Sequence, residues 1–74
     1  MNNITAFRSY IGLRIFRRRQ KMGLPLSFAA YVLAVPIEEL KAYEYGTKEI
    51  YPEMLLKLSK LLHTSISYYT EGLN

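Results

Sequence analysis

Glycine and proline divide this chain into short segments, and that division limits what it can fold into. Gly23, Pro25, Pro36, Gly46 and Pro52 interrupt a sequence of 74 residues. Between them, apolar residues recur every three or four positions, as on one face of a helix, and no segment alternates apolar and polar residues over a useful length. The sequence therefore predicts one small all-α domain, a compact bundle of five helices.

Glycine, proline and capping residues also indicate where the helices are expected to begin and end. Ser9 is a suitable N-cap for the first helix and Gly23 a suitable C-terminal stop, while prolines suit the first turns of later helices. His63 and Thr64 are expected to break the fourth helix. The expected helices cover residues 9–22, 26–33, 36–45, 52–62 and 65–70. Residues 1–8 are predicted to be a flexible arm, and residues 9–74 to be the domain.

Helical spacing gives the expected core. Inward positions are assigned to apolar residues of each segment, with Arg18 completing the stripe of the first helix. The assigned residues are Ile11, Ile15, Met22, Phe28, Leu40, Tyr43, Leu55, Leu58, Leu62, Ile66 and Tyr69. The tyrosines expected at the surface are Tyr10, Tyr31, Tyr51 and Tyr68.

Charge is unevenly distributed along the chain. Residues 1–37 carry six basic side chains and no acidic one, whereas residues 38–74 carry four lysines and six glutamates. A basic half suits an anionic partner such as a phosphate backbone, although a solvated helix face explains the charge equally well. The sequence has no apolar run long enough to span a membrane and no signal-peptide pattern at its start, so a soluble intracellular protein is expected.

Residues for catalysis or metal binding are scarce. The chain contains no cysteine and no aspartate, and its single histidine, His63, cannot form a zinc site alone. Glu38 and Glu39 are adjacent, so they point to different sides of a helix and cannot act as a facing pair. The sequence predicts no enzyme, no metal, no cofactor and no small-molecule ligand.

Several stretches are typical of one family when taken together. They are IGLRIFRRR (11–19), GL (23–24), Ala30, LKAYEYGTKEI (40–50) and LLKLSKLLHTSISYYTEG (55–72). The chain resembles the Cro/CI-type (XRE) helix-turn-helix transcriptional regulators, most closely the versions common in alphaproteobacteria. The resemblance implies a lambda-repressor-like fold, a double-stranded DNA partner, a homodimer, and a place in the cytoplasm at the bacterial nucleoid. It also implies that the third helix enters the major groove.

The resemblance assigns roles to individual residues. In the family, a buried arginine and glutamate pair across the fold, which corresponds here to Arg19 and Glu44. The residues expected to contact DNA are Arg18, Ser27, Ile37, Glu38, Lys41, Ala42, Tyr45, Thr47 and Lys48. The last two helices are expected to form the dimer interface through Met54, Leu61, Tyr68, Tyr69 and Leu73.

Departures from the family pattern keep other functions open. Pro25 and Leu26 replace a polar pair that contacts DNA, Ala34 replaces the turn glycine, and Glu38 and Glu39 repel phosphates. These changes suit a scaffold rebuilt to bind another protein, such as an anti-repressor or antitoxin. A non-specific nucleoid binder is a third possibility. The charge around Ser27, Lys41 and Lys48 is expected to distinguish a DNA-binding protein from a protein-binding one, since a continuous positive face favours DNA.

Overall fold

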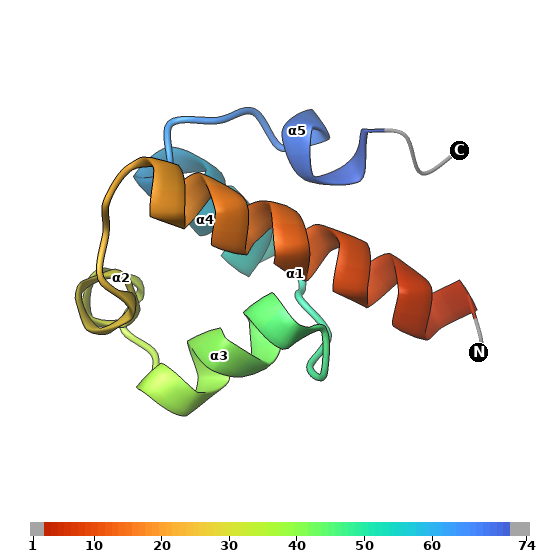
Figure 1. Ribbon diagram of the computed structural model, residues 1–74, viewed down its shortest axis with the longest axis horizontal. Coiled ribbons are helices and arrows are strands. Elements are labelled where there is room, and N and C mark those ends of the chain that lie inside the picture. The colour runs from red at the N-terminus through yellow and green to blue at the C-terminus, as the bar shows by residue number, and fades with distance from the viewer. Residues whose placement is uncertain (1–2, 72–74) are drawn as a thin grey trace.

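The computed structural model describes residues 3–71, and these form five α-helices (Figure 1). They are α1 (Asn3–Lys21), α2 (Leu26–Leu33), α3 (Ile37–Tyr45), α4 (Pro52–Leu61) and α5 (Ser67–Thr70). The long α1 crosses the middle of the molecule, with α3 on one side of it, α5 on the other, and α4 behind. The second helix, α2, closes one end. No strand occurs within the described residues, so the predicted all-α five-helix bundle is confirmed.

The first helix begins earlier than the sequence predicted. Ser9 is not its N-cap but lies inside α1, and residues 3–8 form its first turns. Neither glycine nor proline interrupts this stretch, and it has tertiary contacts of its own. Arg8 pairs with Glu49 at 2.8 Å, and the backbone of Ser9 lies against Gly46. These contacts with the α3–α4 loop explain why the helix continues into the predicted arm.

Most of the predicted core is confirmed. Ile15, Leu40, Leu58, Leu62 and Tyr69 are the largest fully buried side chains. Ile11 and Tyr43 are also buried, and Met22 and Leu55 pack against the cluster from its edge.

Two predicted core residues lie at the surface instead. Phe28 is 48% exposed, because α2 turns Ala29, Ala30 and Leu33 inward and Phe28 falls on its other side. Ile66 is 40% exposed and lies at the residue that precedes α5. The small residues of α2 therefore fix which of its faces packs on the bundle.

Gly12 sets the distance between α1 and α3. A β-carbon built at this position would lie 2.3 Å from the carbonyl oxygen of Tyr43 and 2.5 Å from that of Glu44. Since only glycine lacks this atom, the backbone of α1 lies directly against the last turn of α3. This contact positions the outer face of α3 relative to the rest of the bundle.

The turn between α2 and α3 is tight and contains a left-handed residue. Ala34 has φ 59° and ψ 42°, and its backbone N–H donates to Tyr31 at 3.1 Å. The N–H of Val35 donates to Ala30 at 3.0 Å, which completes the end of α2. Pro36, with φ −61°, then precedes the first residue of α3. The segment is a helix-turn-helix in which alanine occupies a position that favours glycine.

Ala34→Gly is expected to stabilise the protein. The left-handed conformation costs a non-glycine residue about 1–2 kcal/mol, while the extra freedom of glycine in the unfolded chain costs about 0.4–1 kcal/mol. The net gain should be about 0.5–1 kcal/mol, measured by urea denaturation. Ala30→Gly, in a right-handed and buried position of the same helix, should destabilise. A loss of stability in the Ala34 variant would contradict the assigned turn conformation.

Candidate nucleic-acid interface

The outer face of α3 carries most of the residues that were predicted to contact DNA. Ile37, Glu38, Lys41 and Tyr45 are exposed, and the ring of Tyr45 is 75% accessible. Ala42 is half-buried between this face and the core. Opposite them, Leu40 and Tyr43 anchor the helix in the bundle. The helix therefore has one packed side and one open side. Ser27, at the second position of α2, is also exposed.

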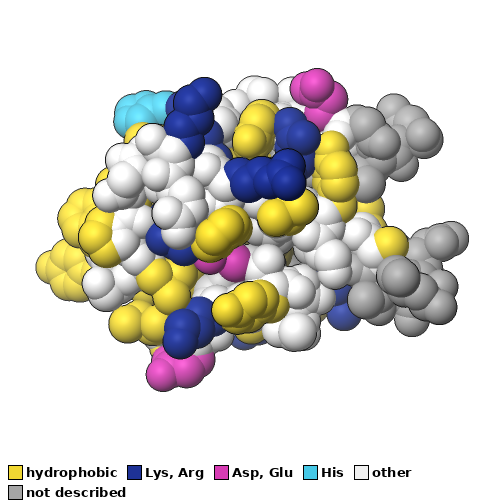
Figure 2. Space-filling model, in the orientation of Figure 1, with side chains coloured by type: hydrophobic (Ala, Val, Ile, Leu, Met, Phe, Trp, Pro, Cys, Tyr) yellow, Lys and Arg dark blue, Asp and Glu magenta, His cyan; other side chains and the backbone are white. Residues whose placement is uncertain are grey.

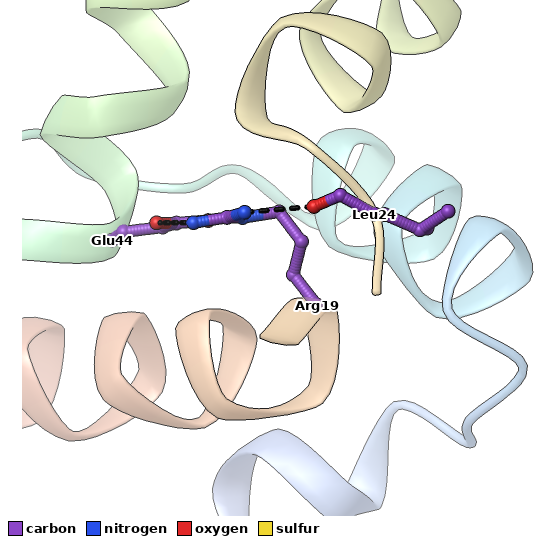
Figure 3. A network of polar contacts seen from close by, with 3 residues as sticks. All are labelled: Arg19, Leu24 and Glu44. Atoms are coloured by element: carbon purple, nitrogen blue, oxygen red, sulfur yellow. Dashed lines mark hydrogen bonds and ion pairs between the residues drawn. The ribbon is translucent and has the colours of Figure 1, made fainter. Parts of the chain in front are cut away.

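Arg19 and Glu44 join α1 to α3 through a buried ion pair (Figure 3). Nε of Arg19 donates to Oε2 of Glu44 at 2.6 Å, and Nη2 donates to Oε1 at 3.0 Å. Nη1 donates to the carbonyl oxygen of Leu24 at 2.8 Å, so the guanidinium also holds the chain that leads into α2. The predicted structural pair is confirmed. Within the described residues no buried side-chain nitrogen or oxygen lacks a hydrogen-bond partner.

Lys48 forms an ion pair instead of presenting a free charge. Its ammonium lies 2.9 Å from Oε1 of Glu39 and 5.7 Å from the centre of the Tyr43 ring. The hydroxyl of Tyr43 donates to Oε2 of the same glutamate at 2.6 Å. These contacts, the tyrosine hydrogen bond first and Lys48 second, lower the pKa of Glu39. Lys48 was predicted to contact DNA, and the sequence did not predict this network, although Glu39 and Tyr43 are one helical turn apart.

Thr47 closes the end of α3. Its backbone N–H donates to the carbonyl oxygen of Ala42 at 2.9 Å, and its hydroxyl donates to the same atom at 3.3 Å. The side chain is nevertheless exposed, so it lies beside the open face of α3.

The contacts of Tyr43 predict how the stability of the protein changes at high pH. Burial, and then the hydrogen bond to Glu39, raise the pKa of Tyr43 to about 12. Because the folded state disfavours the phenolate, stability is unaffected below pH 10 and falls as the pH rises from 10 toward 12. Absorbance titration should show tyrosine ionisation at high pH, and Tyr43→Phe should reduce the amplitude of this late step. Burial raises the pKa of Tyr69 as well, so part of the late step should remain in that variant. Tyr31→Phe, at an exposed residue, is the control and should leave the late step unchanged. A Tyr43→Phe titration identical to wild type would contradict the network.

Arg18 does not lie with the residues of α3. Its Nε donates to the carbonyl oxygen of Leu62 at 2.8 Å, and Nη2 reaches that of His63 at 3.4 Å. The last carbonyls of a helix have no partners within it, and Arg18 supplies donors at the end of α4. Its predicted DNA contact is therefore corrected to a structural contact. Its place on the apolar stripe of α1 was the sequence signal for this role.

Other arginines of the basic half are used within the chain. Arg14 lies over the Tyr68 ring, 4.1 Å from its centre, and its Nε donates to the carbonyl oxygen of Tyr68. Arg8 and Arg19 have the glutamate partners described above. Arg17 and Lys21 are exposed. Most of the basic side chains of the first half thus make contacts within the protein. The face around α3 is not continuously positive.

A hollow lies between α1, the start of α2 and α3. Its volume is about 350 Å³, and its lining residues are Leu13, Phe16, Arg19, Leu26, Lys41, Glu44 and Tyr45. Figure 2 shows hydrophobic and charged side chains side by side across this face. Leu13 and Phe16 were not among the predicted site residues, although both are apolar and fall outside the core stripe of α1.

One residue of the predicted dimer interface belongs to the protomer's own interior. Tyr69 is 0% exposed, and its hydroxyl accepts a hydrogen bond from Thr64 at 2.6 Å, so its assignment to an interface is wrong. Met54, Leu61 and Tyr68 are partly buried against the core. Leu73 lies outside the described residues. The reason is that α5 folds back on α1 and covers this end of the bundle (Figure 1).

The comparisons with known proteins give no family. The sequence matches no protein-family model and no curated protein. Within residues 3–71, no three histidine, aspartate or glutamate side chains come together as metal ligands. No helix in that range is long and apolar enough to cross a membrane.

Proposed function

We propose that the chain binds double-stranded DNA as a sequence-specific transcriptional regulator, with α3 in the major groove. The observation that supports the proposal most strongly is that α3 is packed firmly against α1 on one side and exposed on the other. It follows α2 after a tight turn, is fixed to α1 by Gly12 and by the Arg19–Glu44 pair, and leaves its outer face open. A helix held rigidly with one free face is what major-groove recognition requires.

The exposed side chains of α3 suit contacts with base edges. Lys41 can donate to guanine, Glu38 can accept from the amino group of cytosine, and Ile37 can pack on a thymine methyl group. Ala42 and Tyr45 continue the same face. Glu39 is left out, because it already accepts from Tyr43 and pairs with Lys48.

Backbone contacts would come from the two ends of the motif. Ser27 lies near the start of α2, where free N–H groups favour a phosphate, and Thr47 lies beside the end of α3. Lys48 would have to exchange Glu39 for a phosphate, which reduces its net contribution. As a homodimer, the protein would bind half-sites about 34 Å apart, at the bacterial nucleoid. The family resemblance implies repression by occlusion of a promoter.

Lys41→Ala tests this proposal. It should weaken binding to the preferred duplex by about 1–3 kcal/mol, roughly 5- to 150-fold, and relax specificity at one base pair. Fluorescence titration against a duplex selected from random sequences measures the loss. Lys21→Ala, at the exposed end of α1, should change affinity much less.

The two lysine variants also separate the alternatives. Equal losses for Lys41→Ala and Lys21→Ala, with no preference for the selected duplex over random DNA, would indicate non-specific binding. No salt-sensitive binding to any duplex would refute a role in DNA binding altogether.

A second candidate function is docking of a protein in the hollow between α1 and α3, and the lack of a continuous positive face around α3 favours it over DNA binding. Its walls are apolar, Arg19 and Glu44 neutralise each other at its base, and Lys41 supplies a cation at its edge. This combination suits an amphipathic segment of another protein that carries a bulky apolar side chain beside acidic residues. Leu13→Gln changes the hollow but none of the proposed DNA contacts. Failure of every duplex to bind, together with binding of such a peptide that Leu13→Gln abolishes, would favour this candidate.

A further inference from the structure

The outer face of α2 is apolar and uncovered. Phe28, Tyr31 and Val32 lie one turn apart on the same side of the helix, and Tyr31 is 82% exposed. Figure 2 shows hydrophobic side chains gathered at the end of the molecule that α2 forms. Small monomers seldom leave a bulky apolar cluster in water unless it meets a partner. We call Phe28, Tyr31 and Val32 the α2 patch.

A hollow lies directly beside the α2 patch. It is shallow, with a volume of about 470 Å³, and is formed by α2 and α4 together. Val32, Leu33, Ala34 and Leu61 give it apolar walls, and Lys57 and Lys60 also line it. Apolar walls with lysines among them favour an aromatic ring, because the face of the ring attracts positive charge.

We propose that the α2 patch and this hollow form a two-fold interface between two copies of the chain, with Tyr31 of each copy seated in the hollow of the other. A two-fold contact requires that one surface contain both the projecting group and its receptor. Here the ring and the hollow adjoin on one face, so a single rotation satisfies both.

The charges of this surface are also compatible with a second copy. The sequence of α2, LSFAAYVL, contains no charged residue, so two α2 patches meet without repulsion. On α4, Glu53, Leu56, Lys57 and Lys60 are all exposed at helical spacing. When two α4 helices lie antiparallel across a two-fold axis, Glu53 of one copy approaches Lys60 of the other. The two Glu53–Lys60 attractions thus offset the repulsion between the two Lys57 side chains near the axis.

This interface supplies the dimer that the proposed function needs. It keeps α4 and Leu61 from the expected interface and uses α2 where α5 was expected. Self-association is nevertheless measured without DNA, so its failure and the failure of DNA binding are separate results. It also differs from the second candidate function, because the two hollows share no lining residue.

Tyr31→Lys tests the interface by placing a cation against Lys57 and Lys60 of the second copy. Sedimentation equilibrium from about 5 to 500 µM should show a monomer–dimer equilibrium for the wild type. The variant should raise the dissociation constant at least tenfold. Tyr51→Lys alters another exposed tyrosine outside the α2 patch and should leave the constant within about twofold. Because Tyr31 is so exposed, the variant should fold normally, which far-ultraviolet circular dichroism verifies.

A mixing experiment gives a readout that misfolding cannot imitate. The variant Lys57→Glu places a carboxylate in the hollow, where it can pair with the lysine introduced at position 31, and it leaves Lys60 as the partner of Glu53. In a mixture with Tyr31→Lys, one contact gains opposite charges and the other keeps the original ring and lysines. Heterodimers should form at concentrations where Tyr31→Lys alone is monomeric. A monomeric wild type at 500 µM, unaltered dimerisation of Tyr31→Lys, or no rescue on mixing would overturn the proposal.

Discussion

Gly12→Ala should abolish most of the stability of this protein. The added methyl group would lie 2.3 Å from the carbonyl oxygen of Tyr43 and 2.5 Å from that of Glu44. Both neighbours are backbone atoms of α3, so no side-chain rotation relieves the overlap. Overpacking of this kind costs about 1–3 kcal/mol and occasionally more. A domain below about 80 residues rarely has more than 3–5 kcal/mol to lose.

The sign of this effect is informative because helix propensity acts in the opposite direction. In an α-helix alanine is favoured over glycine by about 1 kcal/mol, so a helix without the close contact would be stabilised. Urea denaturation monitored by circular dichroism measures the outcome. Gly23→Ala is the control, because its β-carbon would meet open space and only its positive φ, 67°, opposes the change. That control should cost about 1 kcal/mol. Any gain in stability from Gly12→Ala would contradict the packing of α1 on α3.

The elements that follow local rules could be predicted from the sequence. The helix α3 ends where Gly46 adopts a left-handed conformation, and the apolar spacing identified Leu40, Tyr43 and Leu58 as core residues. The start of α1 could not be predicted this way. Its first turns depend on contacts of Arg8 and Ser9 with a loop about 40 residues away in sequence.

The sequence predicted which residues of the candidate site face outward, but it did not predict which side chains pair with one another. Helical geometry correctly placed Glu38, Lys41 and Tyr45 outward on α3. It could not tell that Lys48 pairs with Glu39, or that Arg18 reaches the end of α4, because each arginine and lysine side chain has several partners within reach of its long stem. Four of the six basic side chains in the first half of the chain have glutamate or carbonyl partners within the protein. The charge count of this half therefore predicted a more positive surface than the structure has.

Removing either partner of the buried ion pair should be almost as damaging as the glycine substitution. Glu44→Leu leaves the Arg19 guanidinium buried with only the Leu24 carbonyl oxygen to accept from it, and Arg19→Met leaves the Glu44 carboxylate without its two donors. Breaking a buried pair in this way costs about 3–5 kcal/mol. Replacing both by apolar residues of similar volume removes the stranded charge and should cost less than either single change.

The double-mutant cycle built from Arg19→Met and Glu44→Leu measures the coupling between the two side chains. We expect the sum of the single losses to exceed the loss in the double variant by about 2 kcal/mol or more. The same cycle on the exposed pair Arg8–Glu49 should give less than 1 kcal/mol, because solvent screens those charges. Additive losses at Arg19 and Glu44 would contradict the pairing. They would also remove the reason to regard α3 as rigidly mounted, since this pair and Gly12 are the contacts that fix its outer face for a partner.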